Sequence, residues 1–263
     1  MGILQQIKEE AAERLFPRRC PLCGAVIYAN ERICSRCAGD VTFIRHPICR
    51  VCGRPLGTCG CRPGDNAFVR NVSPLVYTRA AKRGIHRMKF RNVPAASVYF
   101  GKLMANAVRS EYLEHGLSFD CVVGVPMYAK DYRERGYNQA GLLARTVAEE
   151  VGVPYSRDLL VKHRATHAQH TLSFRDRREN LRDAFRVKRP EAVRDCVVLL
   201  CDDVTTSGST LNECAVKLLD AGARAVYCVT AAVAVMSEMP AIKAAAFGRA
   251  QQDASGFSGN LPL

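Results

Sequence analysis

The stretch Cys196–Thr210 combines the residue types of this chain that are best suited to chemistry. Val197–Cys201 is a short apolar run, as expected for a buried parallel strand, and the carboxylates Asp202 and Asp203 follow it. Small, mostly hydroxylated residues come next, and a helix is expected from about Leu211 to Leu219. Backbone N–H groups at the start of a helix attract phosphate, and adjacent carboxylates can hold sugar hydroxyls directly or through hydrated magnesium. The stretch therefore predicts a site for a phosphorylated sugar, with a phosphate loop formed by Thr206, Ser207, Gly208, Ser209 and Thr210.

The pattern over Val198–Thr210 resembles the phosphoribosyl-pyrophosphate signature of type I phosphoribosyltransferases. Four apolar residues, two acids, one apolar residue and a hydroxyl-rich loop around one glycine follow each other in that order. The resemblance implies a parallel α/β sheet with flanking helices, in which Asp202 and Asp203 hold the ribose hydroxyls during catalysis.

A second buried strand, Asp120–Pro126, is expected to end beside the first. Ligands of parallel α/β sheets collect at the carboxyl ends of the strands. The polar loop Met127–Arg135 should therefore face the phosphate loop and hold a pyrophosphate group, with Arg133, Arg135 and the backbone around Gly136 as donors. A helix, Ala140–Val151, is expected to follow.

Two basic segments flank these strands. Arg79–Asn92 is predicted to be a basic helix and turn whose end, Lys89-Phe90-Arg91, is a candidate phosphate contact, although a solvated basic face explains it equally well. Tyr155–Lys162 is expected to be a strand leading into a basic, histidine-rich loop, 162–181, which could close over a reactive site and exclude water. A helix over Ser173–Asp183, an edge strand at Phe185–Val187, the organising strand over Cys196–Asp203 and a last strand at Ala225–Ala232 complete the expected domain. Five cysteines in apolar segments are expected to be buried packing residues: Cys121, Cys196, Cys201, Cys214 and Cys228.

The N-terminal part is rich in cysteine, with eight of the thirteen cysteines within residues 17–63. Three C-x-x-C pairs and one C-x-C pair occur there, and four thiolates complete a closed, structural zinc site. We expect two zinc sites, with a redox or iron–sulfur module as the alternative. Sequential pairing would group the ligands as Cys20, Cys23, Cys34 and Cys37, then Cys49, Cys52, Cys59 and Cys61, and an interleaved pairing stays open.

The bulk composition restricts the class of protein further. The chain has 263 residues, so one α/β domain and a small module fit. It has no apolar run long enough to span a bilayer and no signal-peptide centre, which predicts a cytoplasmic location, with a peripheral position at the inner membrane as the alternative. A formal charge of +13 points to polyanionic partners. The expected organisation is a helix over 1–16, a double zinc ribbon over 17–66, a phosphoribosyltransferase domain over 67–236 and a tail over 237–263.

Taken together, residues 17–232 resemble the ComF family of competence-associated, phosphoribosyltransferase-like proteins. The resemblance depends on the double zinc ribbon, the acidic signature and several separate motifs in the family's order, namely Met88–Arg91, Val123–Pro126, Arg133–Gln139, Gln169, Leu172-Ser173, Arg177, Asn180 and Phe185. The chain departs from the pattern at Cys201, where valine or isoleucine is more usual, and at Phe174-Arg175, which puts the acceptor pocket in question.

The family implies a magnesium-dependent phosphoribosyltransferase of unnamed acceptor that serves DNA uptake in natural transformation. Its partners would be phosphoribosyl pyrophosphate and single-stranded DNA or a helicase or translocation protein of competence. The alternative is a non-catalytic module that senses the same ligand or binds DNA. Residues carried over to the pyrophosphate side are Lys89, Arg91, Arg133, Arg135, Gly136, Asn138, Gln139, Gln169 and Arg177.

Overall fold

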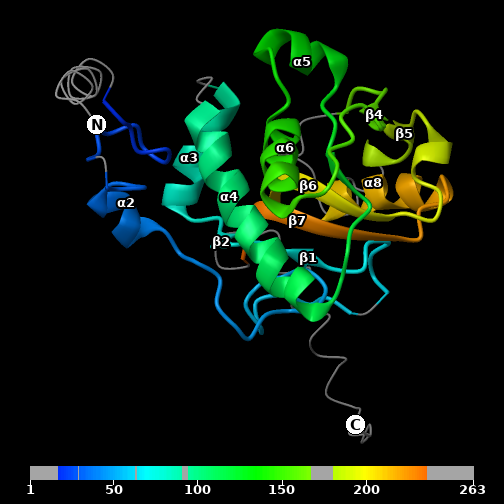
Figure 1. Ribbon diagram of the computed structural model, residues 1–263, viewed down its shortest axis with the longest axis horizontal. Coiled ribbons are helices and arrows are strands. Elements are labelled where there is room, and N and C mark those ends of the chain that lie inside the picture. The colour runs from blue at the N-terminus through cyan, green and yellow to red at the C-terminus, as the bar shows by residue number, and fades with distance from the viewer. Residues whose placement is uncertain (1–16, 29, 63, 91–93, 167–179, 236–263) are drawn as a thin grey trace, which may run out of the picture.

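The centre of the molecule is a parallel sheet in which β6 and β7 are the inner strands (Figure 1). The computed structural model describes residues 17–28, 30–62, 64–90, 94–166 and 180–235. β7 (Ala225–Val233) pairs with β6 (Val197–Thr205) on one side and with β1 (Asn71–Val72) and β2 (Leu75–Val76) on the other. β3 (Cys121–Gly124) lies beyond β6. The predicted parallel α/β sheet is therefore confirmed, and its carboxyl ends collect at one edge.

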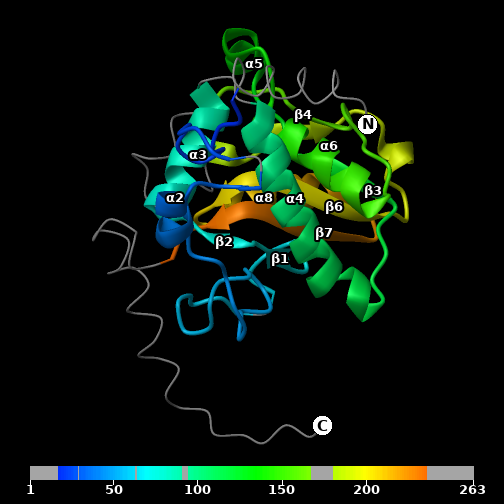
Figure 2. The same cartoon turned by 60° about the vertical axis from the view of Figure 1, so that its left-hand side comes forward.

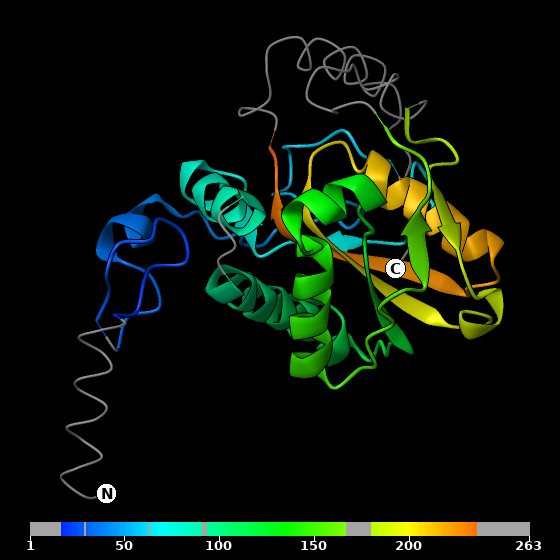
Figure 3. The same ribbon diagram turned by 90° about the horizontal axis from the view of Figure 1, so that it is seen from above.

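Helices cover both faces of this sheet because β6 and β7 are apolar on both sides. Alternate residues of β6, among them Val197, Leu199 and Cys201, pack against α3 (Arg79–Phe90), α4 (Pro94–Glu111) and α6 (Gln139–Val151). The residues between them, Val198 and Leu200, pack against α8 (Ser209–Asp220). Figure 3 shows α8 on one side of β6 and β7, and α4 and α6 on the other.

Most predicted elements are confirmed within a few residues, but several predictions are wrong in detail. β6 continues to Thr205, two residues beyond the predicted strand Cys196–Asp203, because the pairing with β7 extends as far as Thr205↔Val233. The expected loop Met127–Arg135 contains a helix, α5 (Ala129–Arg135), which Gly136 ends with its left-handed φ of 83°. The thiol of Cys196 is not fully buried, since this residue precedes the strand.

The expected strand Tyr155–Lys162 is shorter in the structure. β4 (Leu160–Lys162) pairs antiparallel with β5 (Phe185–Val187), which forms a two-stranded sheet of its own rather than an edge of the main sheet. Tyr155 makes an isolated parallel bridge to Val122 of β3. Most of the predicted helix Ser173–Asp183 lies outside the described residues, as do the predicted N-terminal helix and the tail.

The cysteine-rich segment contacts the sheet domain at two separate places (Figures 1 and 2). Its first part, which includes α2 (Ser35–Asp40), lies beside α3, and its second part lies beneath β1 and β2. Short 3-10 turns at Leu113–His115 and Pro190–Ala192 complete the described elements. In the part of the chain that the structure describes, the helices are too short or too polar to cross a bilayer.

Candidate functional site

Asp203 is a buried carboxylate held by a lysine from another element. The residue is 5% exposed and lies on the face of β6 that meets α3. Lys89 Nζ, at the end of α3, is 2.8 Å from Asp203 Oδ2. Burial alone would lower the pKa of Lys89, but Asp203 and the nearby Asp202 outweigh burial and raise it, so this lysine is charged. Lys89 therefore occupies this carboxylate oxygen, and a ligand that binds there must share it or displace the lysine.

Asp202 is half-buried on the other face of the strand. Its Oδ1 accepts a hydrogen bond from the backbone N–H of Asp203 at 2.8 Å. Burial first, and then the like charge of Asp203, raise the pKa of Asp202 to about 8. A carboxyl group with such a pKa is largely neutral near pH 7 until a cation or a hydroxyl donor stabilises its charged form. The pair therefore offers oxygen ligands of the kind that a hydrated magnesium ion or a ribose diol uses.

The phosphate loop connects β6 directly to α8. Gly208 takes a left-handed φ of 78° there and is the N-cap of α8, and Ser207 Oγ and Ser209 Oγ lie 2.9 Å apart. In the described part of the chain, no acceptor is found for the backbone N–H of Ser207 or of Gly208. The loop thus presents free donors at the positive end of a twelve-residue helix, which is the arrangement that binds a phosphate group.

The residues predicted for the pyrophosphate side lie at the junction of α5 and α6. Asn138 has a structural role, because its Oδ1 accepts from Ala140 N at the start of α6 and its Nδ2 donates to Val125 O at 2.9 Å. Arg135 Nη1 donates to Gln139 Oε1 at 2.6 Å, and its guanidinium lies 5.1 Å from the centre of the Phe90 ring. The end of α3 thus contacts the α5–α6 junction through Phe90 and the acidic pair through Lys89.

Three residues carried over by resemblance lie outside the described residues. They are Arg91, Gln169 and Arg177.

A cavity of about 720 Å³ opens at the carboxyl end of β3, between α5, α6 and β4. Arg133 lines it, together with residues that sequence reasoning did not single out, namely Tyr132, Tyr137, Arg145, Tyr155 and Arg157. Tyr155 begins the predicted strand Tyr155–Lys162 and bridges to Val122 of β3, but nothing in the sequence shows that α5 folds over to close this space. The cavity offers aromatic surface and several cations next to the predicted pyrophosphate loop.

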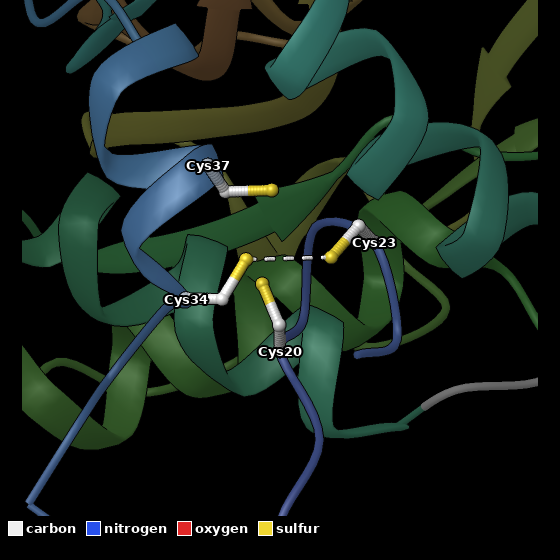
Figure 4. A group of neighbouring side chains, drawn as sticks. All are labelled: Cys20, Cys23, Cys34 and Cys37. Atoms are coloured by element: carbon white, nitrogen blue, oxygen red, sulfur yellow. Dashed lines mark hydrogen bonds between the residues drawn. The ribbon is translucent and has the colours of Figure 1, made fainter. Parts of the chain in front are cut away.

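The eight predicted zinc ligands form two groups of four. Cys20, Cys23, Cys34 and Cys37 make the first group (Figure 4), and Cys49, Cys52, Cys59 and Cys61 make the second. The sulfur atoms within each group lie within 4.8 Å of one another, and Cys23 Sγ is 3.6 Å from Cys34 Sγ. A tetrahedral zinc ion with bonds of about 2.3 Å requires sulfurs about 3.8 Å apart, so both groups fit zinc. The sequential pairing is confirmed, and the interleaved pairing is wrong.

Helix α3 is the platform for the first of these groups. Arg83 Nη2 lies 3.7 Å from Cys37 Sγ and donates to Asp40 Oδ2 at 3.0 Å. A Cβ on Gly84 would lie 2.7 Å from Leu22, which shows how closely the two segments pack. The same helix therefore contacts the first cysteine group along its length and ends at the acidic pair.

Comparisons with known proteins agree with this arrangement. Residues 11–66 match the double zinc ribbon domain model. The DNA utilization protein YhgH of Salmonella typhi is 34% identical over 217 residues, which cover 80% of this chain and 94% of that protein. Competence protein F of Haemophilus influenzae is 32% identical, covering 75% of this chain and 89% of that one.

Solved structures of phosphoribosyltransferases also match part of the chain. Glutamine phosphoribosylpyrophosphate amidotransferase from B. subtilis is 24% identical, with 59% of this chain and 28% of that chain covered and a TM-score of 0.36. Orotate phosphoribosyltransferase from Mycobacterium tuberculosis is 16% identical, with 58% of this chain and 66% of that chain covered and a TM-score of 0.33. Superpositions this loose carry no argument about the site.

The fold and the cysteine groups define a parallel α/β protein with an N-terminal double zinc ribbon. The chain belongs to the ComF family, which contains relatives named for competence and for DNA utilization.

Proposed function

We propose that this protein binds phosphoribosyl pyrophosphate with magnesium at the carboxyl ends of β3 and β6, and that it transfers the phosphoribosyl group to an acceptor in the use of incoming DNA. One observation carries the proposal. The acidic pair Asp202-Asp203 lies near the carboxyl end of a central strand, and the loop after that strand offers unpaired N–H groups at the N-terminus of α8.

Each part of the site has a role in this reaction. The N–H groups of Ser207 and Gly208 and the hydroxyls of the phosphate loop bind the 5′-phosphate. Asp202 and Asp203 accept hydrogen bonds from the ribose hydroxyls and orient the sugar. Magnesium, when bound, would neutralise the charge that develops on the leaving pyrophosphate. Lys89, Arg133 and Arg135 stabilise the same charge from the side of α3 and α5.

The biological setting follows from the relatives. This chain aligns with most of the length of proteins named for DNA utilization and for competence. These similarities support a role in DNA uptake. The formal charge of +13 suits contact with single-stranded DNA or with a nucleic-acid-bound translocation protein. DNA affinity that stayed constant between low and high salt would contradict this electrostatic part of the proposal.

Isothermal titration with phosphoribosyl pyrophosphate and magnesium tests the site. We expect the wild-type chain to bind and the double variant Asp202→Asn/Asp203→Asn to lose at least about tenfold in affinity, because two charge-assisted bonds disappear. The double variant Glu114→Gln/Asp220→Asn removes the same number of carboxylates from exposed positions and serves as the matched control. Equal affinity of all three proteins would refute the assignment.

A non-catalytic function is the second candidate, and the ion pair favours it. Lys89 already occupies one oxygen of Asp203, a carboxylate that the transferase function assigns to the ribose. A protein that only senses phosphoribosyl pyrophosphate can keep the ion pair between Lys89 and Asp203. A transferase needs the ribose hydroxyls to displace Lys89 from Asp203 in each turnover. A screen for pyrophosphate release with nucleobases and other acceptors separates the two functions, since a sensor binds the ligand and releases none.

A further inference from the structure

Arg54 connects the second cysteine group to the ends of the two central strands. It lies between Cys52 and Cys59, and it is only 8% exposed although it carries a charge. Its Nε donates to the carbonyl oxygen of Ala234, just after β7, at 2.6 Å. Its Nη2 donates to the carbonyl oxygen of Thr206, the first residue of the phosphate loop. A side chain of the zinc ribbon therefore reaches into the predicted ligand site.

The main chain that carries Arg54 is fixed on the sheet. Asn71 of β1 donates its backbone N–H to Val51 O at 2.8 Å and its Nδ2 to Cys52 O at 3.1 Å. Gly53 has a left-handed φ of 71°, and a Cβ there would lie 2.5 Å from Asn71 O. Only glycine permits so close an approach. The guanidinium of Arg54 thus starts from a point that moves with the sheet.

Pinning the carbonyl of Thr206 has a direct consequence for the next residue. The peptide group is planar and trans, so the N–H of Ser207 points opposite to the carbonyl of Thr206. A bond from Arg54 to this carbonyl therefore aims the N–H of Ser207 away from the ribbon. That N–H is one of the two unpaired donors of the loop within the described residues.

We propose that Arg54 is a positioning residue through which the second cysteine group, when it holds its metal, orders the phosphate loop for an incoming phosphate group. The inference builds on the proposed function, because it assigns the ribbon a part in forming the same site. Four thiolates fix the turn from Cys49 to Cys61, the turn fixes Arg54, and Arg54 fixes the Thr206 peptide. A chain without this metal would keep its sheet but hold the loop in several conformations.

The test compares Arg54→Met with Arg50→Met. Arg50 lies in the same cysteine group but is exposed, so its variant removes an equal charge without touching the loop. Three readouts are taken: zinc content by native mass spectrometry, hydrogen exchange of the loop without ligand, and affinity for phosphoribosyl pyrophosphate with magnesium. For Arg54→Met we expect retained zinc and a loss of affinity of at least about tenfold, because two charge-assisted bonds are removed. We also expect at least about tenfold faster exchange of the amides that bond within or to the loop, namely Ser209, Asn212 and Ala234. Exchange in β3 and α6 should stay unchanged, and Arg50→Met should behave as wild type.

Unchanged loop exchange in a zinc-loaded Arg54→Met protein would overturn the positioning role. If wild type itself fails to bind phosphoribosyl pyrophosphate, the proposed function fails, while the exchange data still decide the role of Arg54. Should Arg54→Met not fold, Arg54→Lys takes its place, since it keeps the charge but cannot reach both carbonyls with a planar fork. Faster exchange in Arg54→Lys supports the proposal, and wild-type exchange overturns it.

Cys59→Ser should loosen the same loop while the first zinc stays bound, and a loop that stays protected there would refute the dependence on metal.

Discussion

The ion pair between Lys89 and Asp203 gives a prediction whose size follows from the structure. The two side chains are 27% and 7% exposed, and the charged atoms are 2.8 Å apart. Lys89→Met would leave the carboxylate of Asp203 buried without its cation. Removing one partner of a buried pair costs about 3–5 kcal/mol. Because Lys89 is partly exposed, we expect the low end of this range, about 3 kcal/mol.

A double-mutant cycle isolates the interaction from other effects of each substitution. Asp203→Asn should cost less than Lys89→Met, since the freed lysine can reach solvent and the loss of the like charge lets Asp202 ionise. The double variant Lys89→Met/Asp203→Asn should be more stable than Lys89→Met alone. The resulting coupling energy is expected to be about 2 kcal/mol, measured by urea unfolding at pH 7.

Lys102→Met is the control for this cycle. Lys102 lies 3.6 Å from Glu150, but its side chain is 60% exposed, so its loss should cost less than about 0.5 kcal/mol. A coupling energy within about 0.5 kcal/mol of zero for Lys89 and Asp203 would show that solvent, and not the lysine, stabilises the carboxylate. The reasoning that links α3 to the acidic pair would then be refuted.

Three further predictions concern stability and metal. The pKa of Asp202 is raised to about 8 in the folded state, so the stability contributed by its protonated form is full below pH 4 and is lost as pH rises towards about 8. The free energy of unfolding of Asp202→Asn should therefore rise, relative to wild type, by at least about 1 kcal/mol between pH 5 and pH 9. An equal difference between the two proteins at both pH values, measured by urea unfolding, would contradict this. Cys37→Ser should lower the zinc content from two ions to one in native mass spectrometry, because each group of four closes independently, and a loss of both ions would contradict the independence. Gly84→Ala should destabilise the protein by about 1–3 kcal/mol in thermal or urea unfolding, since its Cβ would lie 2.7 Å from Leu22 and 2.9 Å from Phe100, whereas a neutral effect would mean that these side chains move aside freely.

The sheet could be predicted from the sequence because its strands carry local signals. The apolar runs at Cys121–Gly124, Val197–Cys201 and Ala225–Val233 are short and rich in valine or other apolar residues. The cysteine spacing likewise predicts both groups of four. The end of β6 differs by two residues from the predicted strand, because pairing with β7 continues through Val204 and Thr205.

The partners of the site residues could not be read from local patterns. Lys89 and Asp203 are far apart in the sequence, and a basic helix end gives no indication that its lysine will face a buried carboxylate. Arg54 resembles any of the exposed arginines of the ribbon until the fold places it beside Thr206. Helix α5 was missed because its seven residues are mostly charged and lack an apolar face.

The position of β7 at the centre of the sheet has a consequence for synthesis of the chain on the ribosome. β7 is the last strand in the described chain, yet β1, β2 and β6 all pair with it. Until residues 225–233 leave the exit tunnel, those three strands have open edges, and open apolar edges invite association between nascent chains. Arg54 cannot make both of its hydrogen bonds before this strand is made, because one of its two acceptors is the carbonyl oxygen of Ala234. The second cysteine group therefore gains its bond to Ala234 only after β7 has been made, and a chain that stops before β7 would be a substrate for chaperones and proteases rather than a smaller working protein.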